Sequence, residues 1–66
     1  MIRRIKHIEE RRLNGMKVTI NFMERIQYNG RWESDGYDVE VNGKQMFTFV
    51  GYPTNHDILS RITPER

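Results

Sequence analysis

Side chains that could carry acid-base or metal chemistry are few in this 66-residue sequence. His7 and His56 are the two histidines, and a metal site would need both of them with nearby carboxylates. Glu24, Glu33 and Asp35 would converge on one side of a predicted hairpin, where like charges raise a pKa as in a catalytic pair. An exposed hairpin is also acidic when it is simply hydrated, and so short a chain forms no deep cleft there. We therefore predict neither a metal site nor a catalytic residue.

Sequence motifs for other kinds of catalysis are missing. The chain contains no cysteine, which excludes disulfides and thiolate zinc sites. It has no glycine-rich phosphate loop, no nucleophile elbow and no serine, histidine and aspartate set in a recognisable context. We predict a non-enzymatic protein that uses no cofactor and binds no small-molecule substrate. Without cysteine or an apolar run long enough to span a bilayer, the protein is expected in the cytoplasm and not in a membrane.

Length and composition predict one small domain over residues 1–66. Hydrophobic residues make up 36% of the chain and charged residues 30%, which is enough apolar material for a packed core and too much for a disordered chain. A domain of this size buries a small core and commonly depends on a disulfide, a metal or a second copy of itself. Because cysteine is absent and no metal site is expected, self-association is the remaining option.

The N-terminal segment combines a helical spacing of apolar residues with a basic surface. Isoleucines at every third position predict an amphipathic helix over residues 2–13, with an apolar stripe formed by Ile2, Ile5, Ile8 and Leu13. Asn14-Gly15 tolerates the left-handed conformation at a helix end, so the basic helix is assigned to residues 1–15. Residues 1–17 hold six basic and two acidic side chains. An alternative hypothesis makes Met16 the natural first residue and the helix an upstream extension.

The middle of the chain, residues 16–50, has the alternation and the turn signals of an antiparallel meander. From Lys17 onward apolar and polar residues alternate, as in a strand with one buried face. Asn29-Gly30 and Asn42-Gly43 are strong hairpin signals, because a type I′ turn requires positive φ at both central positions. Three strands joined by two hairpins follow from these turns.

The position of each turn sets the pairing of the strands. A two-residue turn at Asn29-Gly30 pairs apolar residues across the first hairpin, namely Val18 with Val41, Ile20 with Val39, and Phe22 with Tyr37. For the second hairpin, a three-residue turn with Gly43 as a bulge pairs Tyr37 with Phe47. We expect the end of the first hairpin, where charged residues oppose one another, to project into water as an arm.

A short helix is predicted over residues 54–63. Thr54 is the expected N-cap, and Asp57 lies in the first turn, where a carboxylate favours the unpaired amides. Pro64 disfavours a helical conformation at the residue before it. The buried stripe consists of Ile58, Leu59 and Ile62. The predicted fold class is therefore α+β in the order α-β-β-β-α, a three-stranded antiparallel meander with an N-terminal amphipathic helix and a short C-terminal helix.

One face of the predicted sheet is unusually apolar for a surface in water. If the aromatic residues of the meander face the C-terminal helix, the opposite face carries Met23, Trp32, Met46, Thr48 and Val50. The N-terminal helix could cover this face and complete a three-layer domain. The alternative cover is a second copy of the chain or another protein. We predict an interaction module that forms a homodimer or docks a protein partner through this face.

A second functional hypothesis starts from the basic residues. Aromatic rings between arginines, as in the first hairpin, can stack on bases beside phosphate contacts. A nucleic-acid-binding domain would use the basic helix and this hairpin, through Arg3, Arg4, His7, Arg11, Arg25 and Arg31. Arginines on a protein surface are also ordinary hydrated residues, and the net charge is only +2. Nucleic acid is therefore the alternative partner.

Overall fold

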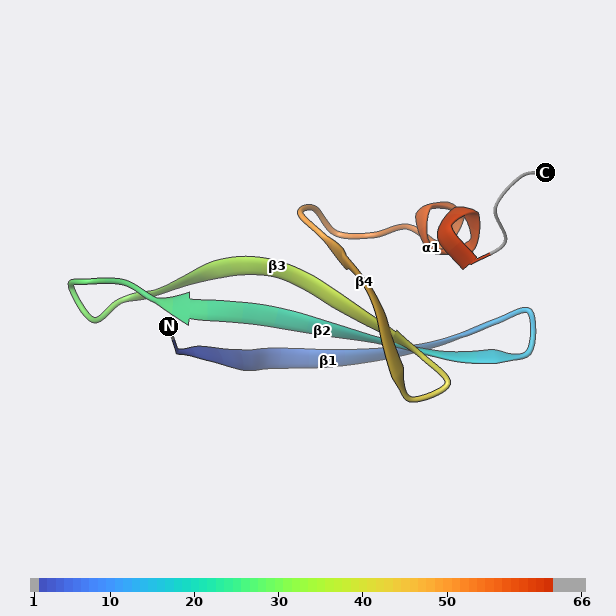
Figure 1. The fold of residues 1–66 in the computed structure, drawn as a ribbon, viewed down its shortest axis with the longest axis horizontal. Helices are drawn as coiled ribbons and strands as arrows, with labels where there is room; N and C mark the ends of the chain where they lie inside the picture. Colours follow the sequence, from blue (N-terminus) through green and yellow to red (C-terminus); the bar gives the residue numbers. More distant parts are fainter. Residues whose placement is uncertain (1, 63–66) are drawn as a thin grey trace.

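The fold is a four-stranded antiparallel sheet with a helix on one face. A computed structural model describes residues 2–62 and contains, in this order, β1 (Arg3–Leu13), β2 (Met16–Ile26), β3 (Trp32–Val41), β4 (Lys44–Phe49) and α1 (Asn55–Ile62) (Figure 1). Each strand pairs with the next along the chain, so that β1 and β4 are the two edges. Within these residues, no helix is long and apolar enough to cross a bilayer.

The predicted N-terminal helix is wrong, because residues 3–13 form the strand β1. Asn14 and Gly15 have φ values of 50° and 79°, which makes them the two central residues of a hairpin turn instead of a helix end. The pairing of β1 with β2 shifts between Ile5 and His7, so that Lys6 is an extra residue. This bulge places Ile5 and Ile8 on the same face, and their three-residue spacing resembles that of a helix.

The predicted core register of β2 and β3 is confirmed, but the predicted turn between them is wrong. Gln27 N donates to Arg31 O at 2.8 Å, and Gly30 N donates to Gln27 O at 3.0 Å, which closes a three-residue loop. A bulge near Gly36 then absorbs the resulting shift of one residue. The apolar pairs are as expected: Val18 with Val41, Ile20 with Val39, and Phe22 with Tyr37.

Gly36 occupies a position that only glycine can fill without strain. Its φ is +82°, in the left-handed region that side chains with a Cβ rarely adopt. A Cβ added at Gly36 would also lie 2.7 Å from the carbonyl oxygen of Phe49. The end of β4 therefore passes directly over the bulge in β3.

The second hairpin also differs in detail from the prediction. Asn42 and Gly43, with φ values of 53° and 85°, form a two-residue turn. The bulge lies further on, where Met46 has no opposite residue on β3. Tyr37 consequently pairs with Phe49 and not with Phe47, which pairs with Val39. Both phenylalanines still share a face with the core residues of β3.

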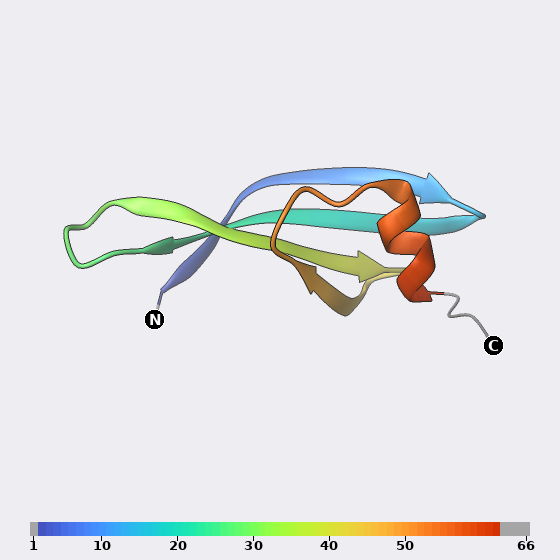
Figure 2. The same cartoon turned by 90° about the horizontal axis from the view of Figure 1, so that it is seen from above.

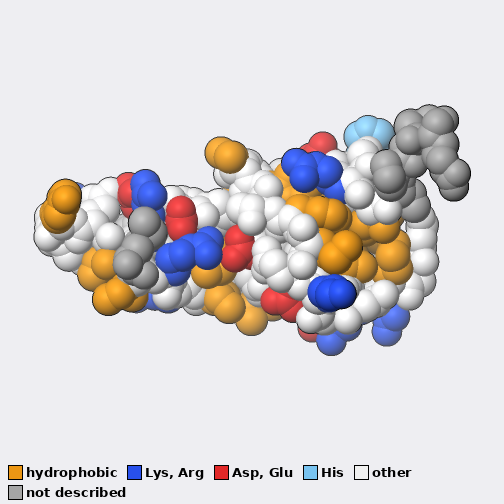
Figure 3. All heavy atoms as spheres, in the orientation of Figure 1, with side chains coloured by type: hydrophobic (Ala, Val, Ile, Leu, Met, Phe, Trp, Pro, Cys, Tyr) orange, Lys and Arg blue, Asp and Glu red, His pale blue; other side chains and the backbone are white. Residues whose placement is uncertain are grey.

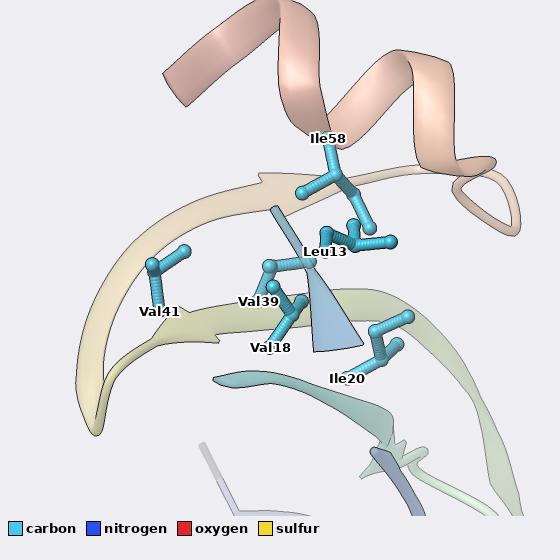
Figure 4. Close-up of a cluster of buried hydrophobic side chains, with 6 residues drawn as sticks. All are labelled: Leu13, Val18, Ile20, Val39, Val41 and Ile58. Carbon is cyan, nitrogen blue, oxygen red and sulfur yellow. The ribbon is translucent and has the colours of Figure 1, made fainter. Parts of the chain in front are cut away.

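The core lies between α1 and one end of the sheet. Figure 4 shows side chains from β1, β2, β3 and α1 that point toward one another. The buried apolar residues are Leu13, Val18, Ile20, Val39, Val41 and Ile58. Because Leu13 belongs to the N-terminal strand, β1 contributes to this core as well as to the sheet.

The start of α1 agrees with the prediction. Asp57 N donates to Thr54 Oγ1 at 3.1 Å, and Thr54 N donates to Asp57 Oδ2 at 3.1 Å, so the two residues cap each other. The backbone hydrogen bond from Thr54 lowers the pKa of Asp57 below its ordinary value, with a further contribution from the Thr54 side chain. Ile58 is fully buried, as expected. The predicted last residue, Thr63, and the proline after it lie outside the described residues.

Polar contacts hold the beginning of α1 against β1. Arg11 Nη1 donates to Asn55 Oδ1 at 2.7 Å, and Arg11 Nε donates to Glu9 Oε2 at 2.8 Å. The Tyr52 hydroxyl, in the segment before α1, donates to Glu9 Oε1 at 2.8 Å. The bonds from Arg11 and then Tyr52 lower the pKa of Glu9. These hydrogen bonds thus connect the C-terminal part of the edge strand β1 to the start of α1 and to the segment before it.

Candidate protein-interaction surface

The sheet extends well beyond the helix that covers it. The described molecule measures 45 × 21 × 17 Å, whereas an eight-residue helix is about 12 Å long. Figure 2 shows that α1 crosses the strands at one end of the sheet, near the turn between β1 and β2. We call the other end, residues 2–6 and 23–35, the arm, and the remainder of the sheet the covered half. No other element of residues 2–62 covers the arm.

The arm exposes several large apolar side chains. The exposed fraction is 63% for Ile2, 49% for Ile5 and 37% for Ile26, while Tyr28 in the loop is fully exposed. Figure 3 shows hydrophobic side chains on the surface at the arm end of the molecule, separate from those beneath α1. Soluble proteins expose single apolar residues routinely, but several of them close together are typical of a contact region. Ile5 lies beside Met23 on one face of the arm, and Ile26 lies beside Trp32 on the other, so both faces of the arm carry exposed apolar side chains.

Trp32 lies within the arm and is partly covered by an arginine. The guanidinium carbon of Arg4 lies 3.8 Å from the centre of the Trp32 ring, in cation-π geometry. Arg4 Nε also donates to Glu24 Oε1 at 3.0 Å, which holds the guanidinium in place. The contact shields one side of the indole and places a positive charge on the arm surface.

The charged residues of the arm form ion pairs with one another. Arg3 Nε lies 2.6 Å from Asp35 Oδ2, and Arg25 Nε lies 2.9 Å from Glu33 Oε2. Together with Glu24, the two carboxylates were the candidates for a catalytic acid pair. Each of these three carboxylates instead forms an ion pair with a different arginine of the arm. The arm still holds five basic residues against three acidic ones, so Lys6 and Arg31, which lie outside these three ion pairs, leave it with a net charge of +2.

The second face of the covered half is polar and is suited to contact with water. Asn21, only 5% exposed, donates from Nδ2 to Glu40 Oε2 at 2.8 Å. The Thr48 hydroxyl donates to Asp38 Oδ1 at 3.3 Å. The predicted apolar face opposite the C-terminal helix would need a helix or a partner to cover it. In this half, the polar face that is observed does not need such a second layer. Exposed large apolar side chains lie in both parts of the molecule: Ile2, Ile5, Ile26 and Tyr28 in the arm, and Ile8, Met46, Val50 and Tyr52 outside it.

The structure does not bring the five predicted interface residues together on one surface. Met23 and Trp32 lie on the arm strands β2 and β3. Met46 is the bulged residue of β4, and Thr48 follows it on the same strand. Val50, with an exposed fraction of 96%, lies in the bend after β4. Met23 and Trp32 lie on opposite faces of the arm, and the others lie at the opposite edge of the sheet.

Sequence reasoning missed three isoleucines and a tyrosine on the arm. The sequence pattern assigns Ile2 and Ile5 to a helix stripe, and it does not include Ile26 or Tyr28 among the interface residues. The overlooked signal is Asn14-Gly15, the same dipeptide that predicted both other hairpins. Treated as a hairpin, it would have made the N-terminal segment a strand and put its isoleucines at an exposed edge.

The predicted nucleic-acid residues do not form one basic face. Four of the arginines pair with carboxylates within the chain, namely Arg3, Arg4, Arg11 and Arg25. His7 packs edge-on against Phe22, with ring centres 5.1 Å apart, and Arg31 lies exposed in the loop. Because these arginines already have anionic partners, phosphate contacts would have to replace internal ion pairs.

The two histidines are far from any metal-binding arrangement. His7 lies on β1 and His56 in the first turn of α1. In residues 2–62, no group of three or more histidine and acidic side chains could hold a metal ion. A comparison with protein-family models finds no match, and no curated protein or solved structure is significantly similar to the chain.

Proposed function

We propose that the chain is a non-enzymatic interaction module that associates with a second copy of itself or with another protein through the arm. The observation that carries this proposal is the exposure of Ile2, Ile5, Ile26 and Tyr28 on a part of the sheet that α1 leaves uncovered. Burial of such residues against a partner removes apolar surface from water, which favours association. A cytoplasmic location, expected from the absence of cysteine, belongs to the same proposal.

The charge arrangement supports a protein partner over a nucleic acid. Arg3, Arg4 and Arg25 are held by carboxylates of the arm at 3.0 Å or less. A polyanion would meet these carboxylates as well as the arginines, which reduces the gain from phosphate contacts. The carboxylates of the arm do not repel an apolar surface of a protein partner in this way.

The experiment is sedimentation equilibrium of the purified chain across a wide range of concentrations. We expect the average mass to rise with concentration, and Ile26→Ser combined with Tyr28→Ser to weaken the association by about tenfold or more. Val50→Ser is the matched control, because it removes an exposed apolar side chain outside the arm. An effect of Val50→Ser that equals that of the arm variant would contradict the proposal.

The single tryptophan provides a second readout. Trp32 emission is expected to shift to the blue as the concentration rises, and to be unchanged by mixed DNA and RNA oligonucleotides. A monomeric chain whose Trp32 anisotropy rises with oligonucleotide, and falls again with salt, would favour the nucleic-acid alternative. That result would replace the arm contact as the proposed function.

A further inference from the structure

The free edge of β1 has a regular set of outward-facing backbone groups. Leu13 and Met16 close the two-residue turn, so alternate residues back from Leu13 direct their hydrogen-bonding groups toward β2. The intervening residues, including Glu10 and Ile8, direct theirs outward. On the N-terminal side of the Lys6 bulge, the alternation of inward and outward residues is reversed. Ile2 O accepts from Ile26 N at 3.2 Å, which places Ile2 toward β2 and makes the outward residues Ile5 and Arg3.

The bulge gives this edge a self-complementary register. In a regular strand, Ile5 and Ile8 would lie on opposite faces of the sheet. With Lys6 as an extra residue, both lie on one face, and both turn their backbone groups outward. Two copies of β1 that pair antiparallel about the bulge therefore set Ile5 opposite the partner's Ile8. The exposed fractions of these side chains are 49% and 52%, so both have surface left to bury.

Charges along β1 are complementary in this same register. The register sets Arg3 opposite the partner's Glu10, and Arg4 opposite the partner's Glu9, each twice by symmetry. Within its own chain Arg3 lies beside Arg25 and pairs with Asp35 at 2.6 Å and Asp38 at 3.5 Å, so the partner's Glu10 would add a third carboxylate near these two arginines. Glu10 is available, since its ion-pair partner, Lys17, lies 3.6 Å away and both side chains are more than half exposed.

Neighbouring registers are less favourable. A shift of two residues in one direction would set Arg3 against the partner's Arg12 and Arg4 against the partner's Arg11. Like charges directly opposite one another in a sheet are destabilising. A shift in the other direction would leave Arg3 opposite the partner's Ile8 without a charge partner. Basic residues before the bulge and acidic residues after it thus select one alignment.

We propose that two copies of the chain join through β1 into a continuous eight-stranded sheet, with Ile5 opposite the partner's Ile8. This inference rests on the proposed function and specifies the geometry of self-association. Because the pairing is antiparallel, the arm of each copy lies beside the covered half of the other, as the positions of α1 and the start of β1 in Figure 2 imply. A second copy would also satisfy the need of a small domain for further burial.

A cysteine cross-link tests the register directly, because the chain has no cysteine of its own. Directly opposite residues in a hydrogen-bonded pair have Cα atoms about 5.5 Å apart, which a disulfide can span. Mixing Ile5→Cys with Ile8→Cys under mild oxidation is expected to give a covalent dimer in high yield. Mixing Ile5→Cys with Met46→Cys, which is on the other edge of the sheet, is the matched control and should give little.

A charge exchange tests the ion pairs independently. Glu10→Lys sets a lysine against the partner's Arg3 twice, and is expected to raise the dimer dissociation constant by about tenfold or more. Arg3→Glu should weaken the dimer similarly, while an equimolar mixture of the two variants should form a heterodimer. Lys44→Glu on β4 is the control for a charge reversal away from the proposed contact. Far-UV circular dichroism verifies that each variant keeps its strands.

The outcomes separate this inference from the proposed function. A strong cross-link together with heterodimer rescue supports pairing through β1. Self-association that is weakened by the Ile26→Ser and Tyr28→Ser variant, but not by Glu10→Lys, and that gives no more cross-link than the control, overturns the edge pairing and leaves the arm contact standing. A chain that stays monomeric at every concentration overturns the edge pairing, whatever protein the arm binds.

Discussion

The covered half and the arm are built from the same three long strands, yet they differ in what lies on their faces. In the covered half, α1 buries Val18, Ile20 and Val39 completely, and the opposite face carries a hydrogen-bonded polar network. In the arm, Ile2, Ile5 and Ile26 face solvent. The difference indicates that fold stability resides mainly in the covered half, and that the arm's apolar residues are available for a partner.

Two bulges mark the boundary between these regions. Lys6 is the extra residue of β1, and the shift in β3 lies next to Gly36. A bulge bends its strand and increases the local twist, so the arm turns away from the plane beneath α1. The short helix cannot follow this turn. The length of α1 and the position of the bulges together set how much of the sheet remains uncovered.

The largest expected effect comes from the core of the covered half. Ile20→Ala removes a fully buried side chain and should lower the free energy of unfolding by about 2–5 kcal/mol, which includes the cost of the cavity. Ile5→Ala, at a half-exposed position of the arm, is the matched control and should cost less than about 1 kcal/mol. Urea unfolding followed by circular dichroism measures both. Equal losses would show that the arm carries as much of the stability as the core.

Gly36→Ala tests the connection between the two regions. The positive φ costs about 1–2 kcal/mol for a residue with a Cβ, and the 2.7 Å approach to the Phe49 carbonyl adds to this cost. Gly30→Ala is the control, because φ is +81° there but no atom lies within 4 Å of the added Cβ. Thermal unfolding should rank Gly36→Ala as the more destabilised variant. The reverse ranking would exclude a close approach of β4 to the bulge.

Amide hydrogen exchange should separate the two regions without any substitution. At concentrations where the chain is monomeric, amides of the arm should exchange about tenfold faster or more than those of the covered half, a difference of about 1.4 kcal/mol in opening free energy. The reason is that few buried apolar contacts oppose opening of the arm. Uniform protection across β2 would mean that the sheet opens only as a unit. Protection of β1 amides that increases with concentration would sharpen the case for edge pairing.

The smallest expected effect is the acid sensitivity of the helix cap. The pKa of Asp57 is lower in the folded chain than its ordinary value because Thr54 donates to the carboxylate. Its contribution to stability is therefore present above the unfolded pKa and is lost as the pH falls through the folded pKa. Unfolding measured from neutral to acidic pH should show a shallower loss for Asp57→Asn than for the unmodified chain. An identical pH profile would exclude the cap as a source of the dependence.

Much of the fold follows from local sequence patterns. The cap formed by Thr54 and Asp57, the presence of a hairpin at Asn42-Gly43 and the pairing of Ile20 with Val39 were all predictable, because each depends on residues close in sequence or on simple alternation. The strand conformation of the N-terminal segment was not predicted from its apolar spacing. A bulged strand with apolar residues three apart has the same spacing as one face of a helix.

The candidate surface was predictable only in part. The exposed arm at the first hairpin was predicted from the charged residues that oppose one another near its turn, and Met23 and Trp32 were predicted from the apolar sheet face. The contribution of Ile2 and Ile5 depends on β1 lying beside β2, which residues distant in sequence determine. Ion pairs of the arm such as that between Arg3 and Asp35 likewise join residues far apart along the chain.

The sequence by itself determined the helix cap, the presence of hairpins at residues 29–30 and 42–43, and the apolar residues that form the core, because backbone preference and side-chain alternation act locally. Only the tertiary structure decided that residues 3–13 pair as a strand, since the hydrogen bonds and packing supplied by β2 and α1 outweigh a weak helical pattern. It also decided which isoleucines are exposed. The helix is too short to cover the whole sheet, so one end keeps its apolar side chains in contact with solvent.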